Sequence, residues 1–235
     1  MENRTVEAGS LMYARIAGIM YVVIIVIGLL HAALIDAELI VPADEATSAV
    51  TSVANSVFFR VGIAATLVMY ASVVVLSWSL YVLLKAVNRN LALLAMLLRL
   101  GEAILGAATV LVSLIVLHLA SGEESLAAFD AGQLQALVAV FLHVRTAGLD
   151  VVLVFVGLGG TLFCYLFFTS KYVPRVLAAW GMFTYVSMLG LALVSILFPD
   201  HPVIIEDVLY SLGAGFEFVM GFWLLIKGVK LEEQV

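Results

Sequence analysis

The sequence predicts an all-α, polytopic membrane protein built as a bundle of six transmembrane helices. Of its 235 residues, 64% are hydrophobic and 12% are charged, whereas soluble proteins average about 45–50% apolar and about 25% charged residues. The mean hydropathy is +1.18. The apolar residues also gather in six stretches, each near the length of about 20 residues that crosses a bilayer. A soluble enzyme, a disordered chain and a secreted disulfide scaffold are therefore excluded.

The first span is expected over residues 13–34. Its apolar run is long, and no clear small-x-small cleavage site follows before Asp36, so an uncleaved helix is favoured over a signal peptide. The next break, 35–58, is the longest in the chain. Its apolar side chains recur on one helical face, which predicts a short helix lying at the membrane interface.

The second and third spans are expected over 59–84 and 91–120, joined by a short basic turn. The fourth is expected over 148–169, although its apolar character extends back to Ala131. A helix from that residue would be about 58 Å long. Because this length exceeds the thickness of a bilayer, the helix must either protrude from the membrane or break near Gly148.

The fifth and sixth spans are expected over 176–198 and 205–226. Pro174 suits the turn before the fifth span or the start of its helix, because proline restricts the backbone and has no N–H to donate. Together the six spans leave no room for a soluble domain. One transmembrane domain is therefore expected over 1–235.

The breaks between the spans alternate in charge. Eight of the eleven lysines and arginines lie on one side of the membrane: Arg4, Arg15, Lys85, Arg89, Lys171, Arg175, Lys227 and Lys230. By the positive-inside rule this side is cytoplasmic. The prediction is a multi-pass plasma-membrane protein with both termini in the cytoplasm. The net charge of −6 concentrates on the other side, so the lipid bilayer, and no nucleic acid, is the expected partner.

Four charged residues form the predicted intramembrane polar site: Arg99, Glu102, Asp150 and Glu217. A charge at the centre of a bilayer costs about 2.5–3.5 kcal/mol, so such residues face the bundle interior and pair. Glu102 and Glu217 lie about 16 Å and about 15 Å from the cytoplasmic edge, near the midplane. Arg99 shares a helical face with Glu102 and can bridge both acids, whereas Asp150 lies nearer the outer edge.

A second set of charged residues forms a predicted outer polar cluster: Arg60, His143, Arg145, Glu206 and Asp207. Arg60 is expected to pair with Asp150 or Glu206. Histidines on this side invite comparison with a zinc site, but the sequence has no HExxH or other tight ligand pair. No metal, cofactor or catalytic residue is therefore assigned.

Several segments resemble a bacterial and archaeal membrane family labelled domain of unknown function 4386: 15–18 (Arg-Ile-Ala-Gly), 98–103 (Leu-Arg-Leu-Gly-Glu-Ala), 148–159 with Asp150, 172–175 (Tyr-Val-Pro-Arg) and 222–228. The resemblance covers nearly the whole chain. It implies six spans, a prokaryotic source and family-pattern roles for Arg99, Glu102, Asp150 and Glu217, but it supplies no activity. One departure is Phe216, where the family tends to have glycine.

Three functions are compatible with these residues. The favoured hypothesis is binding or transport of a small amphiphile or ion through the intramembrane polar site, since membrane proteins use paired charges at this depth for relays and substrate paths. The alternative is a structural or regulatory membrane component whose charges serve assembly only. The lesser alternative is an intramembrane enzyme at the outer face that uses Asp150, His143, Glu206 and Asp207.

Overall fold

The computed structural model describes residues 2–31, 57–121, 126, 128–198 and 202–230. The interfacial helix is predicted within residues 35–58, of which 35–56 lie outside the described residues. The last two, 57 and 58, belong to the start of the second span.

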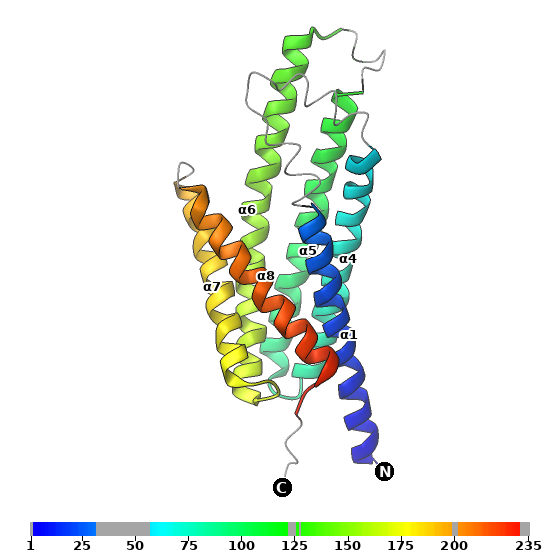
Figure 1. The fold of residues 1–235 in the computed structure, drawn as a ribbon, viewed down its shortest axis with the longest axis vertical. Helices are drawn as coiled ribbons and strands as arrows, with labels where there is room; N and C mark the ends of the chain where they lie inside the picture. The colour runs from blue at the N-terminus through cyan, green and yellow to red at the C-terminus, as the bar shows by residue number, and fades with distance from the viewer. Residues whose placement is uncertain (1, 32–56, 122–125, 127, 199–201, 231–235) are drawn as a thin grey trace.

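Six helices form the described part of the chain (Figure 1): α1 (Glu2–His31), α4 (Val57–Leu84), α5 (Arg89–Leu119), α6 (Ala131–Ser170), α7 (Arg175–Leu197) and α8 (Val203–Ile226). All six are long and apolar enough to cross a membrane. The predicted all-α, six-span fold is thus confirmed, and the chain is a multi-pass membrane protein. Pro174 stands directly before α7, at its N-cap.

Helix α6 differs from the predicted fourth span because it begins near Ala131 and runs unbroken through Gly148. Its 40 residues give a length of about 60 Å, roughly twice the hydrocarbon thickness of about 30 Å. A capping box starts it: Asp130 Oδ1 accepts from the Gln133 backbone N–H at 2.8 Å, and Gln133 Oε1 accepts from that of Asp130 at 3.0 Å. The sequence allowed either a helix that breaks near Gly148 or a continuous helix longer than the membrane is thick, and the structure has the continuous helix.

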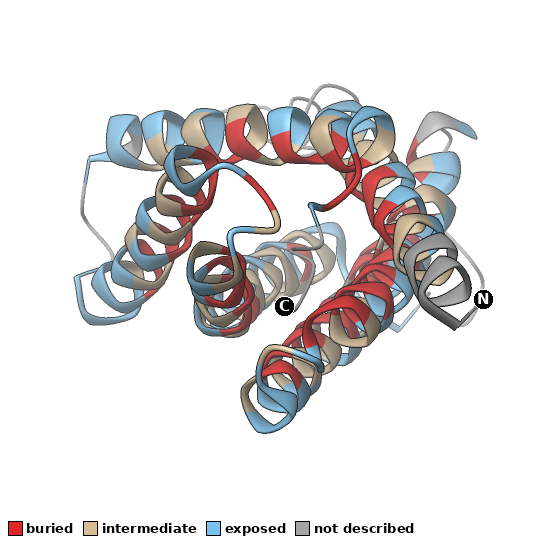
Figure 2. Cartoon of the chain, turned by 90° about the horizontal axis from the view of Figure 1, so that it is seen from below, coloured by how far each residue is buried: buried red, intermediate tan, exposed pale blue. Residues whose placement is uncertain are grey.

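The helices pack as a closed ring in chain order, with α8 returning to α1. Buried residues face the inside of this ring and exposed residues face outward (Figure 2). Large apolar side chains are among the exposed ones, such as Val176 at 82% and Ile226 at 68% exposure, as expected of a lipid-facing surface. Helix α1 begins and helix α8 ends at the same end of the bundle (Figure 1), here called the termini end; the opposite end is called the far end.

The interior is packed differently in the two halves. Toward the termini end, one core cluster draws buried residues from all six helices, among them Ala17, Leu84 and Phe167. Toward the far end, the second cluster draws its buried residues from α4, α5 and α6, among them Phe59 and Val110. Helices α7 and α8 lean away from the others there (Figure 1). Among the described residues, the core cluster that joins all six helices therefore lies in the termini half.

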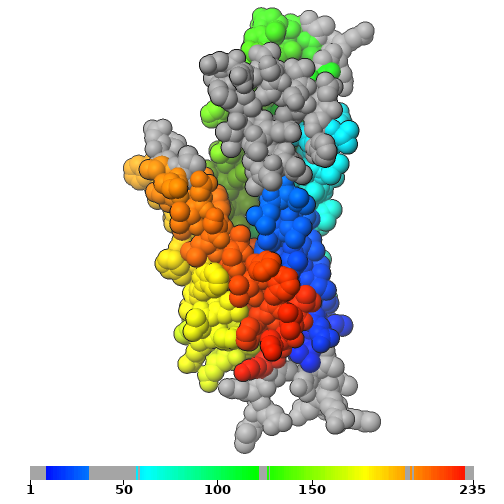
Figure 3. All heavy atoms as spheres, in the orientation of Figure 1, coloured from blue at the N-terminus to red at the C-terminus, as the bar shows by residue number. Residues whose placement is uncertain are grey.

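Helix α8 crosses the face of the molecule between α7 and α1 (Figure 3). Two glycines allow α8 to approach α1 closely. A Cβ added at Gly18 would lie 2.7 Å from the backbone oxygen of Gly221 and 2.7 Å from the backbone nitrogen of Leu225. Small residues of this kind let membrane helices come into backbone contact, and here they close the ring.

Replacing Gly18 with alanine is expected to destabilise the bundle by about 1–3 kcal/mol, because the added methyl group meets helix backbone, which cannot rotate away. The measurement is the thermal unfolding midpoint of the purified protein in detergent. Gly9→Ala is the matched control on α1, since a Cβ there meets nothing within 4 Å. Equal midpoints for the two variants would contradict the close crossing.

Candidate functional site

A buried ion pair lies in the interior, on α5. Arg99 is 4% exposed and Glu102 is 5% exposed. Nη1 of Arg99 lies 2.8 Å from Oε2 of Glu102. The arginine N–H is not aimed well enough at this oxygen to make a hydrogen bond, so Oε2 is buried with an ionic partner but without a directed donor. The pair joins positions i and i+3 of one helix, so it links no two helices by itself.

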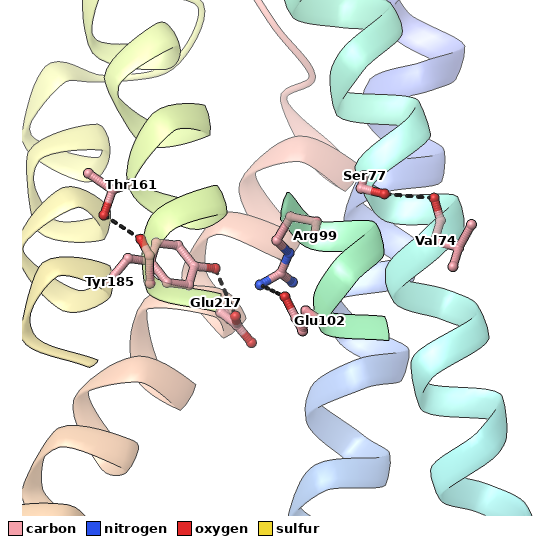
Figure 4. Close-up of polar contacts among 8 residues, drawn as sticks. Val74, Ser77, Arg99, Glu102, Thr161, Tyr185 and Glu217 are labelled. Atoms are coloured by element: carbon pink, nitrogen blue, oxygen red, sulfur yellow. Dashed lines mark hydrogen bonds and ion pairs between the residues drawn. The ribbon is translucent and has the colours of Figure 1, made fainter. Parts of the chain in front are cut away.

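A second carboxylate approaches the same arginine from another helix. The Tyr185 hydroxyl on α7 donates to Oε1 of Glu217 on α8 at 2.8 Å, and Glu217 and Arg99 interact electrostatically. Figure 4 shows the guanidinium between Glu102 and the Tyr185–Glu217 pair. Glu217 is partly accessible, whereas the other three side chains are buried. We call Arg99, Glu102, Tyr185 and Glu217 the central polar cluster.

Two adjacent glycines of α6 make room for this cluster. A Cβ at Gly159 would lie 2.9 Å from Cγ of Arg99, and a Cβ at Gly160 would lie 2.5 Å from the ring of Tyr185. The arginine from α5 and the tyrosine from α7 therefore lie against opposite parts of a bare stretch of helix. The glycine-rich sequence after Asp150 thus acts as a packing surface for site residues.

The structure brings together three of the four residues of the predicted intramembrane site: Arg99, Glu102 and Glu217. Asp150 is elsewhere, because it precedes Gly159 by nine residues of continuous helix, or about 14 Å along the axis. It lies toward the far end. The expected bridging by Arg99 takes the form of one ion pair, to Glu102, and a longer-range interaction with Glu217.

The structure does not gather the predicted outer polar cluster into one site. Arg145 bonds to His31 on α1, whereas His143 is exposed and bonds to the Ala139 carbonyl of its own helix. Arg60 is exposed on α4, and Asp150 and Glu206 each have interactions of their own. Glu206 and Asp207 lie near the start of α8, which packs against α1 and α7.

Sequence reasoning missed several polar side chains of the interior. Tyr185 was not distinguishable from an ordinary core aromatic, and Tyr21, which lies beside it on α1, was not singled out either. The bond between His31 and Thr66 joins α1 to α4 across 35 residues of chain. The one available signal was a face of α7 on which the small residues Gly181 and Thr184 accompany Tyr185.

The chemistry open to the central polar cluster follows from its charges. Two carboxylates share the field of one guanidinium, and one of the two is partly accessible. Such a group can hold a proton or a small cation beside Glu217, with the Tyr185 hydroxyl fixing one carboxylate oxygen. Buried charges of this kind are stable only when they are paired or neutralised.

Comparison with protein-family models identifies a family that matches most of the chain. The family model described as domain of unknown function (DUF4386) matches residues 16–228, most of the chain. No curated protein matches. No solved structure matches.

Proposed function

Because the chain belongs to the family described as domain of unknown function (DUF4386), which names no activity, we propose a function from the site itself. The protein binds, and by binding can transport, a small ion or amphiphile through the central polar cluster inside the membrane. The charge count of this cluster favours an ion, either a proton or a small monovalent cation.

The observation that carries the proposal is the ratio of two carboxylates to one guanidinium in the bundle interior. Glu102 already has Arg99 as its partner at 2.8 Å. Glu217 has a neutral phenol as its hydrogen-bond donor, which leaves its negative charge to be balanced by something else. A bound proton or cation supplies that balance.

The alternative, in which the charges serve assembly only, explains less of the geometry. Arg99 and Glu102 pair within α5, and a pair within one helix does not hold two helices together. Arg99 reaches another helix only through its longer-range interaction with Glu217 on α8, whereas each charge raises the cost of membrane insertion. A binding role gives these charges a reason to be present.

The proposed orientation of the bundle in the membrane follows from the distribution of lysine and arginine along the chain. The termini end carries the basic turns around Lys85 and Lys171, and cytoplasmic loops are enriched in lysine and arginine. We place the termini end in the cytoplasm and the far end outside the plasma membrane. The half of the bundle that holds the core cluster of all six helices then faces the cytoplasm.

Neutralising Glu217 tests the proposal. In the wild type, the ion that binds should raise the thermal unfolding midpoint in a saturable way, because a ligand of the folded state stabilises by about 2.7 kcal/mol at 100 times its dissociation constant. Lithium, sodium and potassium chloride are compared with choline chloride at fixed ionic strength, and pH is varied separately. Glu217→Gln, which keeps the shape but not the charge, should abolish the response.

The control is Asp207→Asn, an exposed acid on the same helix, which should respond as the wild type does. If the rise in the unfolding midpoint with ion concentration is unchanged in both Glu217→Gln and Glu102→Gln, the ion binds elsewhere and the proposal is overturned. A wild type that responds to none of these ions would favour the assembly role.

A further inference from the structure

A cavity of about 140 Å³ lies in the far half of the bundle, between α1, α4, α5 and α6. We call it the far cavity. Its apolar walls include Phe59, Ile63 and Val110, and its polar groups include Thr66 and Arg145. An engineered protein cavity of about 150 Å³ holds benzene. The far cavity is therefore large enough for one ring or a short alkyl chain.

A directed chain of hydrogen bonds runs along one side of the far cavity. Nη2 of Arg145 lies 2.7 Å from Nε2 of His31, and Nδ1 of His31 lies 2.8 Å from Oγ1 of Thr66. The Thr66 hydroxyl in turn donates to the Gly62 carbonyl at 2.8 Å. Each hydrogen bond of this series therefore orients the side chain that makes the next one.

The direction of the chain follows from the groups themselves. A guanidinium donates and never accepts, so Nε2 of His31 is the acceptor. A proton on Nδ1 then points to Thr66, whose own proton is directed to Gly62. The guanidinium of Arg145 lines the cavity. Arg145 has interactions besides the one with His31, but a guanidinium stays cationic whatever its partners.

Tyr70 separates the far cavity from the central polar cluster. Its ring occupies the space that a side chain at Gly106 would fill, one helical turn beyond Glu102. The phenol interacts with Thr109, which lines the cavity, and electrostatically with Glu102. The cavity is therefore a separate compartment with Tyr70 as the shared wall.

We propose that the far cavity is a second binding site, for a small carboxylate-bearing organic molecule about the size of benzoate. The apolar body lies among Phe59, Ile63 and Val110, and the carboxylate is directed toward Arg145, since guanidinium–carboxylate pairs combine charge with directed hydrogen bonds. The lining combines these apolar side chains with the Arg145 guanidinium and with the hydroxyl groups of Thr66, Thr109 and Ser113, which suits a molecule with an apolar body and a charged end.

The test uses the purified full-length protein in nanodiscs and three probes of similar size: benzoate, benzyl alcohol and toluene. Benzoate should give a saturable rise in the thermal unfolding midpoint and bind most tightly of the three. Arg145→Gln should weaken benzoate about tenfold or more and leave toluene unchanged, as expected for losing one hydrogen bond to a charged group. The control is Arg60→Gln on exposed α4 surface, which should bind benzoate normally.

A second variant keeps the proposal testable if Arg145→Gln does not fold. Gly28 borders the cavity, and a Cβ there meets nothing within 4 Å, so Gly28→Leu should reduce the space of the cavity and abolish binding of all three probes. The matched control is Gly190→Leu on α7, where a Cβ also meets open space. Benzoate binding that is unchanged in Gly28→Leu, or toluene binding as tightly as benzoate, overturns the proposal, as does stabilisation by none of the probes.

The two proposed sites can fail independently. Glu217→Gln, which tests the central polar cluster, should leave benzoate affinity unchanged, so loss of the ion response would not remove the far site. Competition experiments identify the source of the acid. Displacement of benzoate by hexanoate alone assigns the site to water-soluble acids, and displacement also by palmitate in vesicles assigns it to fatty acids of the bilayer. Displacement by neither carboxylate contradicts the site.

Discussion

Replacing Arg99 with glutamine is expected to lower the free energy of unfolding by about 3–5 kcal/mol, the usual result of removing one partner of a buried ion pair. The guanidinium is 4% exposed and lies 2.8 Å from the Glu102 carboxylate. Without it, two carboxylates remain in the interior with no cation in the cluster. The measurement is reversible unfolding in mixed micelles, followed by tryptophan fluorescence.

A double variant tells the loss of charge balance apart from the loss of packing. If uncompensated carboxylate charge causes the damage, Arg99→Gln combined with Glu102→Gln should be more stable than Arg99→Gln alone, by about 1–3 kcal/mol. Arg60→Gln is the control, because this arginine is exposed, and it should change stability by less than about 0.5 kcal/mol. An Arg99→Gln protein as stable as the Arg60→Gln protein would show that the pair is not energetically coupled to the fold.

The transmembrane fold could be predicted because it depends on long apolar stretches and not on individual contacts. Six apolar runs separated by charged breaks leave few other structures, since the backbone inside lipid must satisfy its own hydrogen bonds. The extent of α6 was ambiguous for a physical reason: residues 131–147 are largely apolar and favour a helix, so the sequence has no clear boundary between them and the span that follows. A capping box at Asp130 and Gln133 was the local sign that the helix begins there.

The charged site residues could be predicted because a charged side chain inside a membrane span is energetically unfavourable and therefore rare. Arg99, Glu102 and Glu217 stand out within apolar spans, and the structure places all three in one cluster. The neutral side chains that contact these charges do not stand out in the sequence in the same way. Tyr185 is one of eight tyrosines in the chain, and its choice as the donor to Glu217 depends on how α7 and α8 are rotated, which periodicity does not determine. Asp150 lies toward the far end, away from these three residues, in keeping with the expectation from its depth along the helix that it is nearer the outer edge.

Replacing Tyr185 tests whether this neutral partner organises the central polar cluster. Tyr185→Ala is expected to cost about 3–5 kcal/mol, the range for removing a large buried aromatic ring. The residue is 1% exposed and packs edge-on against Phe216, with ring centroids 5.6 Å apart. The empty space would be bordered by Gly160, which has no side chain to move in, so the site cannot readily collapse.

Tyr185→Phe isolates the hydroxyl. The ring and its packing remain, and only the 2.8 Å hydrogen bond to Glu217 is lost, so a smaller decrease of about 1 kcal/mol is expected for an acceptor that is partly accessible. The same variant should weaken the ion response, because the Glu217 carboxylate is no longer held in one orientation. Tyr165→Ala, at a position 46% exposed on α6, is the control for losing a tyrosine from the lipid-facing surface. If Tyr185→Phe kept the ion response of the wild type while Tyr185→Ala lost stability, Tyr185 would be a packing residue only, and Glu217 would have to be oriented by Arg99 alone.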